Sequence, residues 1–230
     1  MTGLQANLVV MVVCYLYIVL VIVVASYLKR GILSPKASRK FLHSMIGNLP
    51  LIMPYFTNSI FPFLVASPFI IVTFLVTPYS PSKWIAEKLS GLTDITEEGH
   101  HTGLVLYAIS YSALAFLYGT TPYVVAAGIF PMAYGDSTAA LIGMRYGKHK
   151  LGKKSLEGSM GMFLGSFISL TLGMLYFSTI YGFTASSQIL PVLFVSIVVT
   201  IVEFISPSGL DNIAVPLLGS LTFILTGGGV

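Results

Sequence analysis

The sequence predicts an all-α fold, a polytopic membrane helix bundle of about eight transmembrane helices that forms a single domain over residues 1–230. Two observations predict this class. The first is composition: 55% of the 230 residues are hydrophobic, only 9% are charged, and the mean hydropathy is +0.88. The second is that apolar residues occur in sustained runs, and runs of about 20 residues are typical of membrane spans. Together they argue against a soluble globular domain.

The first apolar run, residues 8–28, is the clearest span because it contains no charged residue. Lys29 and Arg30 follow it and no basic residue precedes it, so we expect a membrane span with a stop-transfer flank rather than a cleaved signal peptide. The single cysteine, Cys14, lies inside this span and can form no internal disulfide. The candidate spans lie near residues 8–28, 41–56, 60–77, 103–119, 122–143, 158–181, 189–205 and 213–226.

The second and third candidate spans contain prolines, Pro50 and Pro54 in one and Pro62 and Pro68 in the other. Helices with such interruptions can be tilted, kinked or partly re-entrant. The number of full crossings therefore depends on these two segments.

The positions of the basic residues predict the sidedness. With eight crossings, all twelve Lys and Arg residues fall on one side of the membrane. The positive-inside rule makes this side cytoplasmic and places both termini on the non-cytoplasmic side. The connections on the other side carry no charge; they are residues 57–59, 120–121 and 182–188.

Polar chemistry is accordingly expected on the cytoplasmic face, in three loop segments at 29–43, 144–159 and 203–216. A further mixed-charge loop runs from Ser80 to His101. Within it, the stretch SKWIAEKL is expected to form an interfacial helix anchored by Trp84. His100 and His101 lack the spacing of a zinc site and are interpreted as loop surface.

Asp136 is a charged residue at membrane depth. It lies nine residues before Arg145, which is roughly 13 Å along a helix at the standard rise. An ionisable group there costs roughly 2.5–3.5 kcal/mol on insertion scales, so it usually faces a partner, an ion or water. The alternative is an ion pair that only holds helices together. Small residues at four-residue spacing predict close helix packing nearby; they are Gly135, Ala139, Gly143, Gly161, Gly165 and Ser169.

The stretch GKHKLGKKSLEGS nearly matches a phosphate-binding P-loop through Gly147, Gly152 and Lys153. Lys154 stands where that motif needs Ser or Thr, and the stretch follows a membrane span, so we exclude a P-loop. Clustered lysines near exposed amides still suit a polyphosphate, although a basic loop can also contact anionic lipid headgroups. Ser155 is a candidate cap of the next helix, whose N-terminus can bind an anion, and Glu157 a candidate metal ligand.

Further polar residues lie on the same predicted face. Glu203 ends the seventh span, and Asp211 and Asn212 precede the eighth. Carboxylates that hold Mg²⁺, together with lysines, are what metal-assisted phosphate chemistry needs. His43 enters the second span and is a candidate general base, although a histidine near a helix start is more often capping or solvated.

Three motifs resemble the family of CTP-dependent polyprenol kinases that contains phytol kinase and dolichol kinase. They are RKFLH to Gly47, GDSTAALIGMRYGKHK with KKSLEGS, and the E…P.G.DN…P pattern from Glu203 to Pro216. The family is distantly similar to the CDP-diacylglycerol synthases, whose basic and acidic C-terminal signature is absent here. The resemblance implies a multi-pass enzyme that moves the γ-phosphate of CTP to the hydroxyl of an isoprenoid alcohol.

The resemblance also implies roles for residues. Asp136 and His43 are the candidate catalytic residues, and Arg39 and Lys40 are motif positions of less defined role. The candidate metal ligands, for Mg²⁺ as cofactor, are Asp136, Glu157, Glu203 and Asp211. The candidate nucleotide-binding residues are Lys148, Lys150, Lys153, Lys154, Ser155, Glu157, Gly158, Ser159 and Asn212.

Two other functions are considered. A phosphatidate cytidylyltransferase-like enzyme would use the same metal and CTP, with Arg39 and Lys40 as a site for the acceptor phosphate. A non-enzymatic transporter would use Asp136 and Glu203 as ion sites, but the uncharged outer connections argue against it. The expected partners are the isoprenoid alcohol, a nucleoside triphosphate, membrane lipid and a second copy in a homodimer, without nucleic acid.

Overall fold

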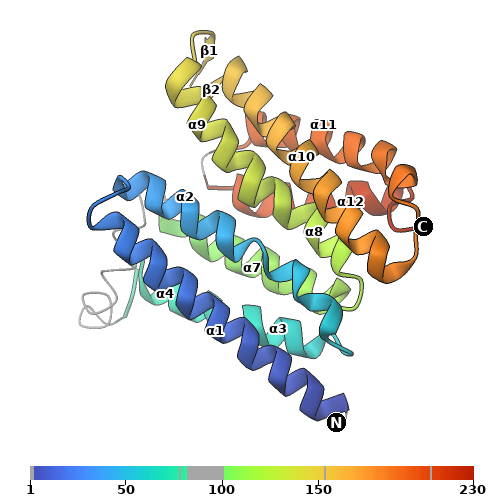
Figure 1. Ribbon diagram of the computed structural model, residues 1–230. Coiled ribbons are helices and arrows are strands. Elements are labelled where there is room, and N and C mark those ends of the chain that lie inside the picture. The colour runs from blue at the N-terminus through green and yellow to red at the C-terminus, as the bar shows by residue number, and fades with distance from the viewer. Residues whose placement is uncertain (1–2, 78, 82–100, 153, 208) are drawn as a thin grey trace.

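The computed structural model describes residues 3–77, 79–81, 101–152, 154–207 and 209–230, which form a helix bundle with one short β-hairpin (Figure 1). The expected interfacial helix at SKWIAEKL lies outside the described residues. The elements, in chain order, are α1 (Gly3–Lys29), α2 (Pro35–Ile46), η1 (Leu49–Leu51), η2 (Met53–Tyr55), α3 (Ile60–Ala66), α4 (Pro68–Leu75), α7 (His101–Tyr118), α8 (Pro122–Phe130), η3 (Pro131–Gly135), α9 (Asp136–Tyr146), β1 (Lys150–Leu151), β2 (Lys154–Ser155), α10 (Leu156–Tyr181), η4 (Ala185–Gln188), α11 (Ile189–Ile205) and α12 (Asp211–Leu225).

The helices form two neighbouring groups. In the first, α1 packs against α2 and α3, and both α3 and α4 pack against α7. In the second, α10 packs against α9 and α11, and α12 packs against α11 and α8. Helix α7 connects the groups because it also contacts α12. Helix α8 lies centrally (Figure 1), where Val125, Ala126 and Ala127 are fully buried.

The outer surface of the bundle is apolar, as expected of a membrane protein. Four described helical segments are long and apolar enough to cross a membrane: Gly3–Lys29, Pro122–Tyr146, Leu156–Tyr181 and Ala185–Ile205. On α1, Cys14 and Ile18 are buried, whereas Leu16 on the opposite face is 64% exposed. A helix that is hydrophobic all round is stable only in a protein core or a membrane. The all-α fold and the membrane character are therefore confirmed.

The second candidate span, residues 41–56, is not one helix. Helix α2 ends at Ile46, and two short 3₁₀ helices follow, with Pro50 and Pro54 in them. Each proline removes a backbone donor, so an α-helix cannot continue through the segment. The third candidate span divides into α3 and α4 at Pro68 for the same reason. Eight uninterrupted crossings are thus not what the chain forms.

The small residues lie where α9 and α10 meet, so the packing prediction is confirmed. A Cβ atom added at Gly161 would lie 3.0 Å from the Thr138 carbonyl oxygen, and one at Gly165 would lie 2.6 Å from Thr138 Oγ1. Close approach of two backbones is what small residues permit in membrane helices. This contact fixes the start of α9, where Asp136 lies, against α10.

Candidate functional site

Asp136 follows a π-helical turn in the middle of the bundle. The η3 turn joins α8 to α9, and the Asp136 backbone N–H donates to the carbonyl of Pro131, five residues earlier. Pro131 has no N–H to contribute to a regular α-helix, which favours a local change of helical pattern. Single π turns inside α-helices occur frequently at functional sites. The turn therefore sets the direction in which the Asp136 side chain leaves the helix.

The Asp136 carboxylate forms an ion pair with Lys40 of α2. The two side chains are 19% and 18% exposed, so each is largely withdrawn from solvent. A charged side chain buried to this extent is costly unless it is paired. Lys40 was a motif position without a defined role in the sequence; the structure makes it the partner of Asp136.

Helix α2 is held beside the π turn by a second polar contact. The Ser44 hydroxyl donates to the carbonyl of Ala133 at 2.9 Å and lies 2.9 Å from the hydroxyl of Ser137. Ser44 is one helical turn after Lys40 and shares its face of α2. The Lys40–Asp136 pair thus stands on two elements that are fixed to each other.

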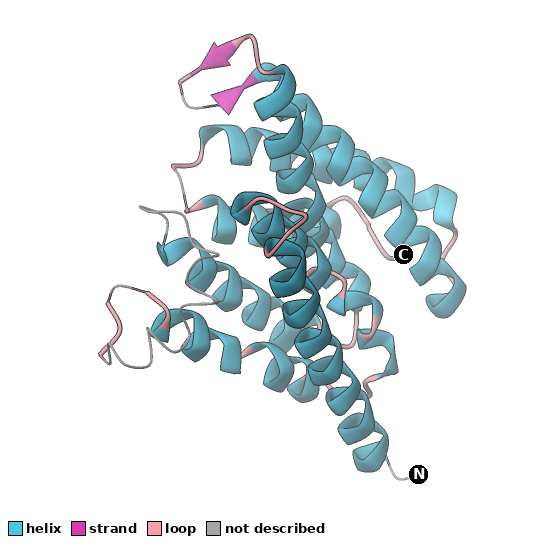
Figure 2. Ribbon diagram, turned by 60° about the vertical axis from the view of Figure 1, so that its left-hand side comes forward, coloured by secondary structure: helices cyan, strands magenta, loops and turns pink. Residues whose placement is uncertain are grey.

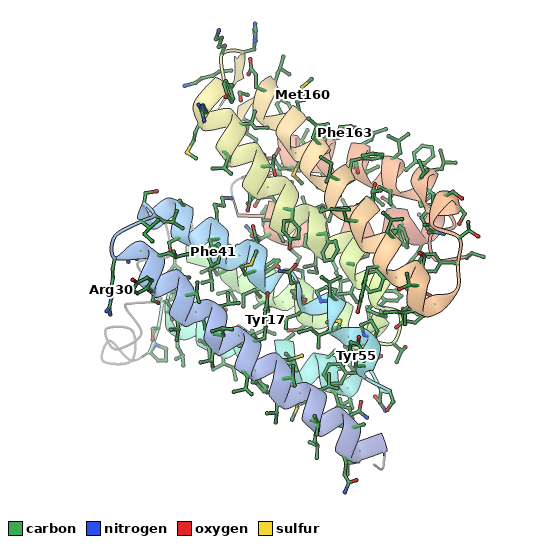
Figure 3. The ribbon with its side chains drawn as sticks, in the orientation of Figure 1. Tyr17, Arg30, Phe41, Tyr55, Met160 and Phe163 are labelled. Carbon is green, nitrogen blue, oxygen red and sulfur yellow. The ribbon has the colours of Figure 1, made fainter. Side chains whose placement is uncertain are left out.

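A tyrosine–asparagine network fixes the other end of α2. Tyr17 of α1 (Figure 3) donates from its hydroxyl to the Met45 carbonyl at 2.7 Å. The Asn48 amide donates to Tyr17 Oη at 3.2 Å, and Asn48 Oδ1 accepts a hydrogen bond from Tyr134 in η3. Hydrogen bonds of this kind connect helices where no water is available. They join α1, the end of α2 and the π turn.

Lys154 and Glu203 form a second ion pair. Lys154 Nζ lies 2.8 Å from Glu203 Oε1 and also donates to the Glu203 carbonyl oxygen. The Glu203 side chain is 11% exposed and the Lys154 side chain 24%. The pair fixes the second strand of the β-hairpin to the end of α11, so the basic segment lies over the carboxylates rather than away from them.

Asp211 begins α12 and organises the turn before it. Its Oδ1 accepts hydrogen bonds from the Gly209 N–H at 3.2 Å and from the Asn212 N–H at 3.0 Å. The Asn212 side-chain amide donates to the same oxygen at 3.0 Å. In this conformation Asn212 therefore supports Asp211, and a contact with nucleotide is not needed to explain its position.

Asp136, Glu203 and Asp211 belong to one electrostatic cluster, which we call the carboxylate cluster. Asp136 interacts with the charges of both other residues, and Lys154 interacts with Glu203 and Asp211. These side chains come from α9, α11, α12 and β2, with Lys40 added from α2. Like charges brought together at a site of low exposure are costly and point to a cationic or phosphate-bearing partner.

Glu157 lies apart from the carboxylate cluster, in the segment of the hairpin. Its Oε1 is 2.7 Å from Nδ1 of His149, and its carboxylate also accepts the His149 backbone N–H at 3.3 Å. Glu157 thus closes the loop around the hairpin. Nothing in this arrangement brings it together with the other three predicted metal ligands.

The hairpin pairs Lys150 with Ser155 and Leu151 with Lys154. It stands at one end of the bundle, which Figure 2 shows with its two strands. Lys148 and Lys150 are exposed there. The expected cap is confirmed, because the Ser155 hydroxyl oxygen accepts the Gly158 N–H at 3.1 Å.

Other predicted nucleotide-binding residues differ in what the structure says of them. Gly158 is buried against α9, where an added Cβ would lie 3.3 Å from the Ala139 carbonyl oxygen. Ser159 Oγ is buried and makes no hydrogen bond within the described part of the chain. Lys153 and the Arg39 side chain lie outside the described residues.

His43 lies one turn along α2 from Lys40, and its ring packs against that of Tyr107 with 4.2 Å between centroids and 31° between planes. It does not lie in an exposed loop. Its position beside the ion pair keeps it within the candidate site, at the wall of an apolar pocket.

The carboxylate cluster suits a shared metal better than an enclosed one. Within the described residues, no three His, Cys, Asp or Glu side chains are close enough to hold a metal ion by themselves. Mg²⁺, however, is usually bound through one or two carboxylates plus substrate phosphates and water. Asp136 with Glu203 or Asp211 fits that requirement, whereas a site including Glu157 does not fit this geometry.

Two parts of the site were missed from the sequence. One is the pairing of Lys40 with Asp136 across 96 positions, and the other is the π turn. Pro131, five residues before Asp136 within an apolar run, is the available signal for the turn. The pairing has no local signal, because it depends on how α2 packs against α9.

The fold and the site define a class: a helical membrane protein whose lysine-paired carboxylates gather beside a basic hairpin. The chain is 31% identical over 213 residues to the phytol kinase of Synechocystis sp., covering 89% of this chain and 86% of that protein. It is 30% identical over 218 residues to the chloroplastic farnesol kinase of Arabidopsis thaliana, covering 86% and 67%. It is 32% identical over 209 residues to probable phytol kinase 1 of Glycine max, covering 82% and 66%.

No family model matches the chain, and no solved structure matches it. The curated relatives nevertheless cover most of its length, including the carboxylate cluster and the hairpin. The chain belongs to the polyprenol kinase family, which includes phytol kinases and farnesol kinases.

Proposed function

We propose that this protein transfers the γ-phosphate of CTP to the hydroxyl of an isoprenoid alcohol of the phytol, geranylgeraniol or dolichol type. The observation that carries the proposal is the carboxylate cluster, in which Asp136 and Glu203 each pair with a lysine below a basic hairpin. The relatives named as phytol and farnesol kinases support the acceptor class. CTP as the donor follows from the motif resemblance.

The lysines act first, by binding phosphate. Lys154 is held at the hairpin by Glu203, and Lys148 and Lys150 stand exposed beside it. An ammonium group that pairs with a carboxylate can exchange it for a phosphate oxygen, since both are anionic acceptors. Nucleotide binding would then free the Glu203 carboxylate for a metal ligand role.

The carboxylates act next. Mg²⁺, when bound, supplies neutralisation of charge on the phosphate oxygens. Asp136 is placed either to ligate this ion or to accept the proton of the attacking hydroxyl, and Lys40 stabilises its anionic form. Phosphoryl transfer needs in-line positioning and charge neutralisation more than a strong base.

We also propose that the site faces the cytoplasm. The turn after α1, with Arg30, and the basic hairpin lie toward the same end of the bundle, while the N-terminus lies at the opposite end (Figures 1 and 3). The positive-inside rule makes the basic end cytoplasmic. A soluble nucleotide reaches a site at that end without crossing the bilayer.

The proposal is tested with purified protein in detergent, Mg²⁺, and CTP labelled at either the α- or the γ-phosphate. The acceptors are geranylgeraniol, phytol, dolichol and phosphatidic acid. We expect γ label, but no α label, in an isoprenoid monophosphate. Label from the α position in phosphatidic acid would instead indicate a cytidylyltransferase, and absence of label from every lipid would favour a transporter. Competition by ATP tests the choice of base.

A further inference from the structure

An apolar pocket of about 150 Å³ lies between α1, α2, α4 and α7. We call it the α2–α7 pocket. Its walls are almost entirely hydrocarbon, with Ile22 from α1, Ile46 from α2, and Phe69 and Val72 from α4 among them. Thr73 also lines it, but the Thr73 hydroxyl is used within its own helix, donating to the Phe69 carbonyl at 2.6 Å. A cavity with such walls has no polar partners for water and favours an apolar ligand.

The pocket has one polar wall. His43 and Tyr107 both line it, and their rings pack together with centroids 4.2 Å apart. Tyr107 and Tyr111 are 6% and 3% exposed, and their hydroxyl groups make no hydrogen bond to any described residue. A buried hydroxyl without a partner is costly, so two of them beside one cavity indicate that a ligand contributes a polar atom there.

The polar wall adjoins the candidate transfer site. His43 and Lys40 are three residues apart on α2, about 4.5 Å along the helix axis. Lys40 in turn pairs with Asp136. A molecule with a hydrocarbon tail and one hydroxyl end can therefore place the tail in the α2–α7 pocket and the hydroxyl toward Asp136.

We propose that the α2–α7 pocket binds the hydrocarbon chain of the isoprenoid alcohol and positions its hydroxyl at the His43 wall, next to Lys40 and Asp136. The inference rests on the proposed function for the identity of the ligand. It assigns acceptor binding to the first helix group, α1 to α7, and nucleotide binding to the hairpin and the second group. The residues that set the preferred chain length then lie in the pocket wall, with Val72 and Phe69 as the first candidates.

The first test is direct binding, which does not depend on turnover. The wild-type protein in nanodiscs is irradiated with a farnesol or geranylgeraniol analogue that carries a diazirine on its terminal isoprene unit. We expect cross-links on pocket-lining residues of α2, α4 or α7, and competition by unlabelled geranylgeraniol but not by an alkane of equal length. Cross-links confined to exposed residues such as Leu16 and Leu20, or competed equally by the alkane, would overturn the proposal.

The second test uses neighbouring positions on α4. Val72 lines the pocket, whereas the adjacent Ile71 is 64% exposed on the outside and does not. We expect Val72→Phe to raise the KM for geranylgeraniol about tenfold or more while leaving the KM for nucleotide unchanged, because one bulky group fills the space of several chain carbons. Ile71→Phe is the matched control and should behave like the wild type.

Phe69→Ala should change the profile in the opposite direction, favouring longer or bulkier alcohols. If the wild type phosphorylates the alcohol but Val72→Phe and Ile71→Phe have the same alcohol KM, the pocket assignment is wrong and the proposed function stands. If the wild type phosphorylates no isoprenoid alcohol, the proposed function fails, and the cross-linking result alone decides whether the pocket binds such chains.

Discussion

Single residues in this protein are polar for identifiable reasons. The chain carries few charges, and the two buried carboxylates with a lysine partner, Asp136 and Glu203, are both near Asp211. An ion pair at low exposure contributes little net stability compared with apolar packing, but breaking one leaves a costly unpaired charge. These pairs are therefore better explained by a function that uses the charges than by stability.

The Lys154–Glu203 pair gives a prediction at this scale. Lys154→Ala leaves the Glu203 carboxylate, 11% exposed, without its ammonium partner. We expect the free energy of unfolding to fall by about 1–3 kcal/mol. The double variant Lys154→Ala/Glu203→Gln should recover most of this stability but no phosphoryl transfer. Thermal unfolding in detergent, followed by circular dichroism, measures the first effect, and labelled CTP measures the second.

Lys148→Ala provides the control, because Lys148 is exposed and belongs to the same basic segment. It should leave stability unchanged. Recovery of full turnover in the double variant would show that the pair is structural only, and would remove Glu203 and Lys154 from the site.

At the scale of elements, the site is built where α9 meets α10 and where α2 meets the π turn. The contact between α9 and α10 depends on glycines. Gly165 lies against Thr138 and the Tyr134 carbonyl, and both belong to segments that flank Asp136. Any side chain there must push α10 away from α9 or distort the turn that carries the carboxylate.

Gly165→Ala is accordingly expected to destabilise the protein by about 1–3 kcal/mol, since the added methyl group overpacks the contact. At Gly143, on α9, an added Cβ would be 3.4 Å from its nearest neighbour, which is an ordinary contact. Gly143→Ala should therefore be neutral or slightly stabilising, because alanine is the better helix former. The two thermal midpoints in the same detergent make the comparison, and equal midpoints would argue against close packing of α9 on α10.

Much of this arrangement could be predicted from the sequence. Asp136, Glu203 and Asp211 stand out because carboxylates are rare in so apolar a chain, and Ser155 is identified as a cap by its position before Glu157 and Gly158. The prolines predicted the interruption of the second and third spans, although not that α2 would end at Ile46. These features are local, so a short stretch of sequence contains them.

The remainder depends on contacts between distant segments. The Lys40–Asp136 pair joins positions 40 and 136, and the α2–α7 pocket is lined by residues from α1 to α7 that are ordinary core residues individually. Glu157 was predicted as a metal ligand from its place after the lysines, but its partner is His149. Which of several nearby polar groups a carboxylate meets is decided by packing, and no spacing rule in the sequence states it.

For the molecule as a whole, the account requires the basic hairpin to face the cytoplasm and the uncharged connection near η4 to face the other side. Two cysteines test this orientation in a Cys14→Ala background, which removes the single native thiol. Lys148→Cys should react with an impermeant maleimide only when the reagent has access to the cytoplasmic side. Ser186→Cys, also exposed, should react only from the opposite side. The reverse pattern would contradict the orientation and place the site away from cytoplasmic nucleotide.

The central claim is that the carboxylate cluster around Asp136 performs phosphoryl transfer. Asp136→Asn keeps the size of the side chain and its ability to accept a hydrogen bond from Lys40, but it removes the charge. The most direct measurement is transfer of the γ-phosphate label from CTP to geranylgeraniol by the wild type and by Asp136→Asn, both shown to be monodisperse and folded. We predict that the rate in the variant falls by about 100-fold or more, as expected when a group that acts electrostatically on the reacting atoms is lost. A folded Asp136→Asn protein with wild-type turnover would contradict the account.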